Sequence, residues 1–304
     1  MSLITDTIKR CAKGLLPPKL GVLYQHEPRP LPTVAIPQPP AYPTDAPRLS
    51  IVTPSFKQGH FIRRTIDSIL DQNYPNLEYI VQDGGSPDDT VEVLKSYGDR
   101  ITSWVSERDK GQSDALNKGF AKTTGDLMAY LNSDDLLMPG SLAVVTDYFA
   151  KHPEVDAVYG HRFIIDEEDR EVGRWVLPAH DPHILAYADY VPQETLFWRR
   201  SAWEKAGGKI DASFRFAMDW DLLLRLQSSG ATIVRLPYFL GAFRVHAAGK
   251  TTSIINEVGA QEMERLRARA LGYVPDYREI NRVLHPYLVK ATVLHHLTAL
   301  HQRV

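Results

Sequence analysis

The sequence predicts an α/β fold in which a mostly parallel central sheet carries helices on both faces. Between residues 49 and 152, short apolar runs alternate with segments of helical periodicity, which is the pattern of strand–helix–strand units. Several of these runs end directly in aspartate, glycine or proline. Hydrophobic content of 43% and charged content of 24% suit an ordinary globular protein. A fold of this class predicts a ligand site beyond the carboxyl ends of its strands.

The bulk composition excludes several classes of protein. A formal net charge of −2 gives no electrostatic reason to expect nucleic acid as a partner. The single cysteine, Cys11, excludes an internal disulfide framework and a cysteine zinc cage. No apolar run reaches the roughly 18 residues of a membrane span, and the first residues carry no convincing signal-peptide core. We therefore expect a cytoplasmic protein, with peripheral contact at the inner face of the membrane as the alternative.

Residues 1–47 differ in composition from the rest and are expected to form an N-terminal extension. Apolar Ile4 and Ile8 beside basic residues predict a short amphipathic helix that Pro17 and Pro18 end. The eight prolines between residues 28 and 47 favour an extended polyproline conformation without a packed core. We expect this extension to lie over the main domain, and a weak membrane-surface or partner contact is the alternative.

The first half of the domain reads as strands that alternate with helices. Strands are predicted at residues 49–54, 77–81, 104–106 and 126–131 from their β-rich apolar runs. A helix begins at Gly59, where apolar residues follow a helical period. Ser86 and Pro87 are expected at the N-cap and first position of a second helix. A third helix over residues 111–122 places Asp114 and Lys118 one turn apart as an i,i+4 pair.

The second half adds an antiparallel excursion and a helical end. A helix to about residue 152 and a strand at 155–159 lead into this excursion at residues 161–177, with a charged turn in its middle. A strand at 195–198, helices at 201–206 and 219–229, and strands at 231–236 and 239–245 follow. We expect the domain to span residues 48–252. The helical segment 253–304 then packs on it or pairs with a second subunit, with a membrane contact as the alternative.

Acidic residues lie where predicted strands give way to loops or helices. Asp83 ends one strand, Asp134 and Asp135 end another, and Asp219 opens a helix. Each alone is commonly a turn residue, a cap or a helix N-terminal acid. A doubly wound sheet, however, gathers such strand ends at one edge. Together they predict one pocket with a nucleotide-recognising carboxylate, a carboxylate for Mg²⁺ or Mn²⁺, and a general base.

In this order and spacing, the motifs resemble those of family 2 glycosyltransferases with a GT-A fold. The resemblance covers about residues 48–250, and the combination is far more specific than any single motif. The matching segments are residues 49–56 (LSIVTPSF), 82–90 (QDGGSPDDT), 109–119 (DKGQSDALNKG), 132–135 (NSDD) and 218–221 (MDWD), together with Arg225.

The resemblance implies an inverting, metal-dependent enzyme that uses a nucleotide-diphospho-sugar, with a UDP-sugar favoured. The acceptor would be a hydroxyl of a saccharide or a lipid-linked molecule in bacterial surface polysaccharide or glycolipid synthesis. On the donor side, the residues implied by motif position are Thr53, Pro54 and Ser55 in the first loop, Asp83 at the base, Asp114 and Lys118 at the ribose and diphosphate, and Asp134 at the ribose or sugar.

The residues implied for the chemistry itself lie later in the chain. Asp135 would bind the metal, and His246, after the last strand, would join the metal or diphosphate shell. Asp219 would deprotonate the acceptor hydroxyl, with Asp221 as the fallback. Gln193 and Trp220 would face the acceptor.

Three departures from the family pattern concern residues beside these acids. Gln82 precedes Asp83 where the family often has a second acid, Asn132 replaces a frequent acid in the metal motif, and Met218 replaces the usual glutamate before the base. Two other functions stay open. A nucleotidyltransferase needs a basic, glycine-rich loop, and residues 53–59 supply only one lysine and one glycine. A non-catalytic module that binds nucleotide or glycan would keep the same fold.

Overall fold

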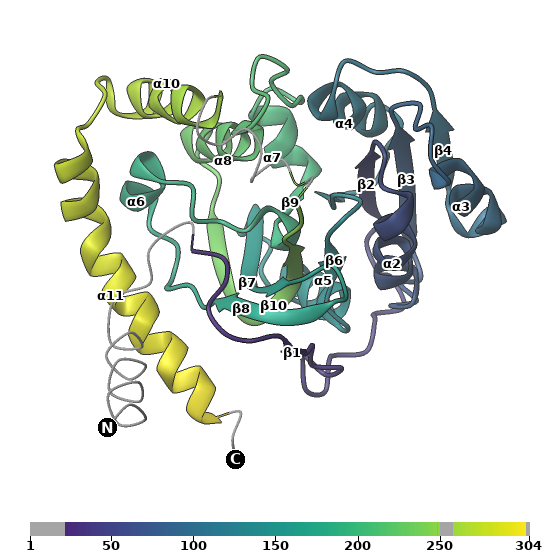
Figure 1. Cartoon of the computed structure of the whole chain (residues 1–304), viewed down its shortest axis with the longest axis horizontal. Coiled ribbons are helices and arrows are strands. Elements are labelled where there is room, and N and C mark those ends of the chain that lie inside the picture. The colour runs from purple at the N-terminus through teal and green to yellow at the C-terminus, as the bar shows by residue number, and fades with distance from the viewer. Residues whose placement is uncertain (1–21, 248, 250–257, 302–304) are drawn as a thin grey trace.

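The computed structural model describes residues 22–247, 249 and 258–301, and its strands form one mixed sheet (Figure 1). The sheet order is β1-β8-β7-β9-β5-β2-β3-β4, and β10 pairs with β7 and β6. The strands are β1 (Arg29–Pro30), β2 (Leu49–Ser55), β3 (Leu77–Asp83), β4 (Ser103–Ser106), β5 (Leu127–Tyr130), β6 (Leu136–Leu137), β7 (Ala157–Ile165), β8 (Arg170–Trp175), β9 (Phe197–Arg199) and β10 (Ile233–Arg244).

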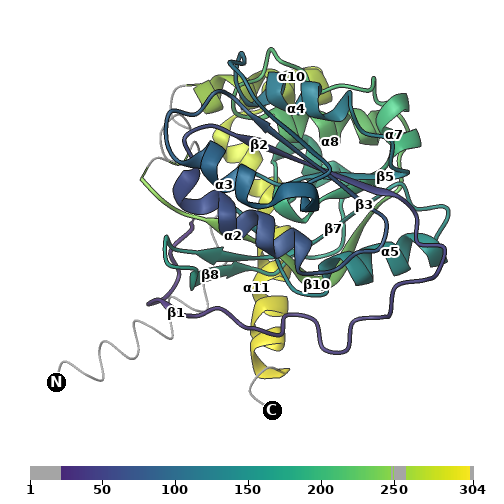
Figure 2. The same cartoon turned by 90° about the vertical axis from the view of Figure 1, so that its right-hand side faces the viewer.

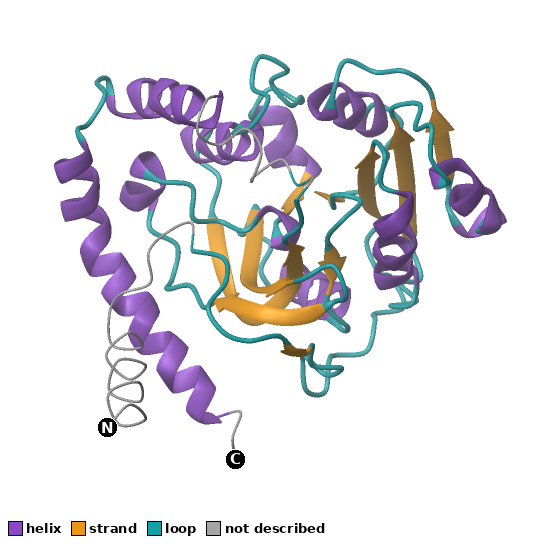
Figure 3. Ribbon diagram, viewed as in Figure 1, coloured by secondary structure: helices purple, strands orange, loops and turns teal. Residues whose placement is uncertain are grey.

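Helices surround this sheet, as the colouring by secondary structure in Figure 3 shows. The helices are α2 (Gly59–Leu70), α3 (Thr90–Ser96), α4 (Gln112–Phe120), α5 (Ser141–Lys151), α6 (Pro182–Tyr187), α7 (Arg200–Lys205), α8 (Met218–Ser228), α10 (Ala260–Leu271) and α11 (Tyr277–His301), with 3₁₀ turns at Gly98–Arg100 and Gln193–Thr195. Across the described residues, no helix combines the length and the apolar character that crossing a bilayer requires.

One half of the sheet is parallel and carries the loops of interest. β2 pairs in parallel with both β3 and β5, and β3 pairs in parallel with β4. β9 is antiparallel to β5 and to β7, so it joins this half to the rest of the sheet. Because parallel strands end at the same edge, the loops after β2, β3 and β5 lie side by side.

Two apolar cores hold helices on opposite faces of the sheet (Figure 2). α4, α7 and α8 contribute Leu116, Trp203 and Leu222 to one core, which also contains Val52 and Tyr130. α2 and α5 contribute to the other, where apolar side chains buried from both helices meet β2 and β3. This arrangement confirms the predicted α/β class with helices on both faces.

The described part of the N-terminal extension packs on the domain with little regular structure. β1 pairs antiparallel with β8, and the Arg29 guanidinium lies 2.5 Å from the buried carboxylate of Glu171. Ile36 and Ala46 are buried in the core. The predicted helix at Ile4 and Ile8 lies outside the described residues. The boundaries at residues 47 and 252 stay predictions.

Several elements differ in detail from the sequence prediction. Ser86 is not an N-cap: its hydroxyl donates to Asp83, and α3 begins later, at Thr90. Asp88 instead accepts from the N–H of Thr90 at 3.2 Å. The two strands expected at 231–236 and 239–245 form the single strand β10, and α6 was not predicted.

Candidate active site

A single large pocket opens at the carboxyl ends of the parallel strands. Its volume is about 1730 Å³, and its lining comes from the loops after β2, β3 and β5, from α4, α8, α10 and α11, and from the end of β10. Of the residues predicted for the site, Pro54, Ser55, Asp114, Asp134, Gln193, Asp219, Trp220 and His246 line it. The pocket therefore joins segments that are far apart in the sequence.

The loop after β3 is built around the carboxylate of Asp83. This side chain is fully buried and accepts hydrogen bonds from the N–H groups of Gly85 (3.1 Å) and Ser86 (2.9 Å) and from the Ser106 hydroxyl (2.6 Å). Gly85 has a φ of +79°, a conformation that favours glycine. Gly84 and Gly85 line the pocket, whereas Asp83 lies beneath them. The Asp83 carboxylate thus fixes the shape of a glycine loop that a ligand can approach.

The first loop and α4 place two more predicted groups. Pro54 and Ser55 face the pocket, but Thr53 is buried within β2, where its hydroxyl accepts from Tyr79 at 3.0 Å. Asp114 lines the pocket, and its carboxylate accepts from the N–H of Lys110 at 3.0 Å and pairs with Lys118 at 3.3 Å. The Lys110 N–H, more than Lys118, holds the pKa of Asp114 below its ordinary value.

The two adjacent acids after β5 point in different directions. Asp135 is 1% exposed; its carboxylate accepts from the N–H of Arg244 at 2.9 Å and from the Asn132 amide at 3.2 Å. Burial, with the carboxylates of Asp134 and Glu194 nearby, raises the pKa of Asp135 well above its ordinary value. Asp134 instead lines the pocket, and its Oδ2 lies 3.0 Å from Nε2 of His246. The acid that reaches the pocket is Asp134.

Asn132 and Gln193 form a polar bridge beside this pair of acids. The Asn132 amide donates to Oε1 of Gln193 (3.1 Å) and accepts from Gln112 (2.7 Å). The Gln193 amide donates to the carbonyl of Tyr130 at 2.7 Å. Asn132, at the position of a frequent acid, thus orders the loop through hydrogen bonds.

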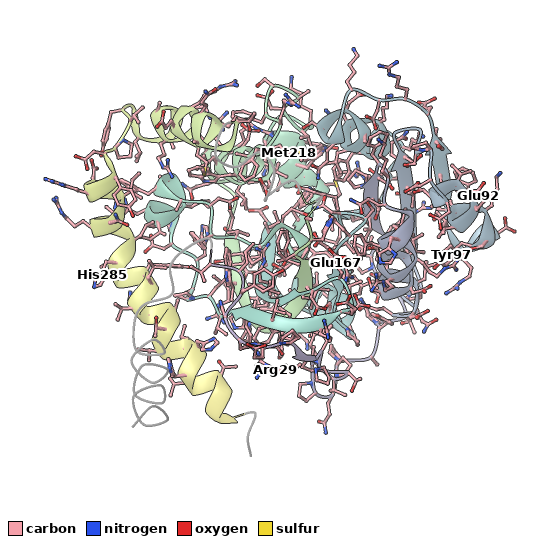
Figure 4. The ribbon with its side chains drawn as sticks, in the orientation of Figure 1. Arg29, Glu92, Tyr97, Glu167, Met218 and His285 are labelled. Carbon is pink, nitrogen blue, oxygen red and sulfur yellow. The ribbon has the colours of Figure 1, made fainter. Side chains whose placement is uncertain are left out.

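The first turn of α8 carries Asp219 into the pocket. Its Oδ1 accepts from the N–H of Trp220 at 2.9 Å, and Trp220 is fully buried with its indole N–H donating to the carbonyl of Leu185. Met218, labelled in Figure 4, receives a hydrogen bond on its sulfur from the Ser113 hydroxyl at 2.9 Å. Met218, which stands where the family usually has a glutamate, therefore links α8 to α4 next to Asp219.

Asp221 has a different environment from Asp219. Its carboxylate is fully buried and pairs with Arg225 at 2.8 Å and with Arg269 at 2.6 Å, and it does not line the pocket. This geometry suits a structural ion pair that joins α8 to α10. It gives no support to Asp221 as the fallback base.

Asp221→Asn is therefore expected to lower stability rather than to remove a reacting group. Losing the charge-assisted hydrogen bond from Arg225 and the ion pair with Arg269 should cost about 2 kcal/mol of unfolding free energy and lower Tm by several degrees. Thermal unfolding monitored by circular dichroism measures this effect, with Asp219→Asn as the matched variant on the same helix turn. Equal Tm values for wild type and Asp221→Asn would contradict the structural role.

Two charged residues of the site, Arg162 and Asp189, were not identified from the sequence. Arg162 on β7 pairs with Glu194 through two hydrogen bonds of 2.8 and 2.6 Å, between the rings of Trp175 and Phe243. Asp189 also lines the pocket. Its pKa is raised well above the ordinary value, mainly by burial and to a smaller extent by the Asp219 carboxylate. Arg162 lies within an apolar strand of the sequence, and this was a usable signal. A charged side chain that is buried in such a strand needs a partner of opposite charge. The loop holding Asp189 offered no such signal.

The donor set suits a divalent cation that shares its shell with a ligand. Carboxylate oxygen and imidazole nitrogen from Asp134 and His246 face the same part of the pocket, and both are ligands for Mn²⁺-type ions. Within residues 22–247, 249 and 258–301, no group of three or more His, Cys, Asp or Glu is arranged to hold a metal. A cation here would need further oxygens from a bound molecule, as Mg²⁺ commonly takes from phosphates.

The fold and the pocket define an α/β protein whose ligand site lies beyond the carboxyl ends of its parallel strands, and the comparisons identify its family. A family model described as "Glycosyl transferase family 2" matches residues 50–202. The chain is 34% identical over 188 residues to the uncharacterised glycosyltransferase Rv1514c of Mycobacterium tuberculosis, covering 60% of this chain and 70% of the relative. The protein belongs to family 2 of the glycosyltransferases and is a transferase enzyme.

Solved structures share the fold at low sequence identity. Residues 1–349 of S. aureus TarS, in complex with UDP-GlcNAc, align with a TM-score of 0.60 and 16% identity, over 79% of this chain and 71% of that one. The mannosyltransferase PcManGT from Pyrobaculum calidifontis, in complex with GDP-Man and Mn²⁺, aligns with a TM-score of 0.59 and 19% identity, over 95% and 80%. These neighbours confirm the predicted GT-A fold.

Proposed function

We propose that the protein is an inverting, metal-dependent glycosyltransferase that moves a sugar from a nucleotide-diphospho-sugar, preferably a UDP-sugar, to an acceptor hydroxyl. The single observation that carries this proposal is the pocket itself, which is lined by Asp134, His246 and Asp219 together with the glycine loop after β3. The neighbours bound to UDP-GlcNAc or to GDP-Man and Mn²⁺ support the donor class.

On the donor side, the loops after β2 and β3 would hold the nucleotide. Gly84 and Gly85 leave backbone open to it, and Asp83 keeps their conformation. Thr53 is buried in the sheet below the first loop, so Pro54 and Ser55 would make the contacts of this loop with the nucleotide. Asp134 and His246 would hold a divalent ion, which when bound supplies positive charge against the leaving diphosphate.

On the acceptor side, Asp219 would accept the proton of the attacking hydroxyl. An alcohol is a weak nucleophile until a positioned base takes its proton in the transition state. Burial, and after it the nearby Asp219 carboxylate, raises the pKa of Asp189 and so favours its neutral form. Direct displacement from the face opposite the leaving group inverts the anomeric centre, with one base acting on the acceptor hydroxyl.

The test is turnover of a panel of UDP- and GDP-sugars with saccharide and lipid-linked acceptors, with and without Mn²⁺. We expect release of nucleoside diphosphate, a requirement for the cation, and a product of inverted anomeric configuration by NMR. Release of a sugar 1-phosphate in place of nucleoside diphosphate would instead indicate nucleotidyl transfer. Binding of nucleotide-sugars without transfer to any acceptor in the panel would favour a non-catalytic binding module.

A further inference from the structure

Apolar side chains from β8, β10, α10 and α11 form part of the pocket lining. We call this surface the apolar wall; its members are Trp175, Phe243, Met263, Ile280, Leu284 and Leu288. Figure 1 shows α10 and α11 on the side of the molecule opposite α3 and β4, so the part of the wall on these two helices lies away from β4.

Helix α11 contributes one continuous face to this wall. Ile280, Leu284 and Leu288 are spaced four residues apart and therefore lie along the same side of the helix. Leu284 is 6% exposed and packs in the core, whereas Ile280 and Leu288 are only partly buried and keep surface toward the pocket. His285 lies on the outer side of the helix (Figure 4). The apolar face is thus directed into the pocket rather than to the outside.

The arginines that border the wall are already engaged. Arg162 is held by Glu194, and Arg267 donates to the carbonyl of Tyr187 at 2.8 Å and lies over the Trp220 ring. Burial lowers the pKa of Arg267 from its ordinary value, in line with an environment poor in water. Tyr277 and Asn281 of α11 also line the pocket, but the six members of the wall carry aliphatic or aromatic side chains, and only the indole N–H of Trp175 can donate a hydrogen bond.

The position of the base decides what reaches the wall. The acceptor hydroxyl must lie at Asp219, and the nucleotide-sugar takes the loops after β2, β3 and β5. The remainder of the acceptor can then occupy the part of the same pocket that α10 and α11 line. A volume of about 1730 Å³ exceeds the roughly 300–1,000 Å³ of a pocket for one small molecule, which leaves room for this second ligand.

Resting on the function proposed above, we infer that the acceptor is an amphiphile whose apolar aglycone, an alkyl or aryl group, lies on the apolar wall. A recessed surface that continues from the reacting centre fits a bound acceptor better than it fits the flat face of a second protein copy. The wall thereby selects lipid-like over purely saccharide acceptors, because burying each methylene contributes to binding.

The test compares acceptors with the same sugar and methyl, butyl or octyl aglycones, below their micelle concentrations, using the full chain and a preferred donor. We expect kcat/KM to rise by up to about fourfold for each methylene that is buried. Leu288→Asn and Ile280→Asn should each remove most of this gain, while nucleotide-sugar binding by calorimetry is unchanged. Val289→Asn is the matched control, since Val289 is 40% exposed and does not line the pocket. Thermal unfolding confirms that each variant is folded.

The outcomes separate this inference from the function on which it rests. Transfer at equal kcat/KM to all three acceptors overturns the inference and leaves the glycosyltransferase function standing. Nucleotide-sugar binding without transfer to any acceptor overturns both. If Leu288→Asn changes the oligomeric state in size-exclusion chromatography and leaves the aglycone dependence intact, the wall is an interface between copies and the inference is wrong.

Discussion

Replacing Asp219 with asparagine is expected to lower kcat by about 10²- to 10⁴-fold, the usual contribution of a general base. Asparagine keeps the acceptor oxygen for the N–H of Trp220, so the first turn of α8 should hold its shape. The amide, however, cannot take a proton from the acceptor hydroxyl. Nucleotide-sugar binding should change little, because the nucleotide loops lie on other elements. Steady-state kinetics with calorimetric titration of the donor measures both effects.

The control for this prediction is Asp147→Asn on α5, where an exposed aspartate pairs with Lys151 outside the pocket. That change should leave kcat and donor binding as they are. If Asp219→Asn kept more than about a third of wild-type kcat, the base would have to be another group. Asp189 would be the next candidate, because it lines the same pocket and the Asp219 carboxylate contributes to its raised pKa.

The parallel half of the fold was predictable because its signals are local. β2, β3, β4 and β5 are short apolar runs with clear ends, and α2 and α4 show helical periodicity with a buried stripe. The motif order then identified the family, which the comparisons confirm. The order of strands and motifs along the chain was therefore enough to predict that the acids lie at one edge of the sheet.

The antiparallel half was less predictable because its strands are interrupted for tertiary reasons. The prediction ended one strand at residue 159 and began the excursion at 161, but β7 runs through Gly160, where an added Cβ would lie 2.5 Å from Leu240. The prediction also separated 231–236 from 239–245, yet β10 continues through Pro237 with irregular register between Arg235 and Phe239. α6 has only six residues, too few for a periodic pattern to be recognised.

Side-chain direction in the site could not be read from the motif. The sequence places Asp134 and Asp135 side by side, and the resemblance implied Asp135 as the metal ligand. Which of the two reaches the pocket depends on the N–H of Arg244, 109 residues further along the chain, which binds the Asp135 carboxylate. The Arg162–Glu194 pair likewise joins two elements that no local pattern connects.

Asp134→Asn is expected to raise the Mn²⁺ concentration for half-maximal activity by at least about 10-fold, because losing a metal ligand should cost no less than losing one of its supporting partners. His246→Ala should act in the same direction, since its Nε2 faces the same carboxylate at 3.0 Å. The measurement is activity against Mn²⁺ concentration at saturating donor, together with the Mn²⁺-dependent Tm shift produced by UDP.

Asp135→Asn separates this assignment from the one implied by the motif. Asparagine can still accept from the N–H of Arg244, but it loses the second oxygen that accepts from Asn132. A lower Tm with a nearly unchanged Mn²⁺ requirement is therefore expected. If Asp135→Asn removed the metal requirement while Asp134→Asn left it intact, the buried carboxylate would have to turn toward the donor on binding. The direction of Asp134 into the pocket would then be a property of the ligand-free conformation alone.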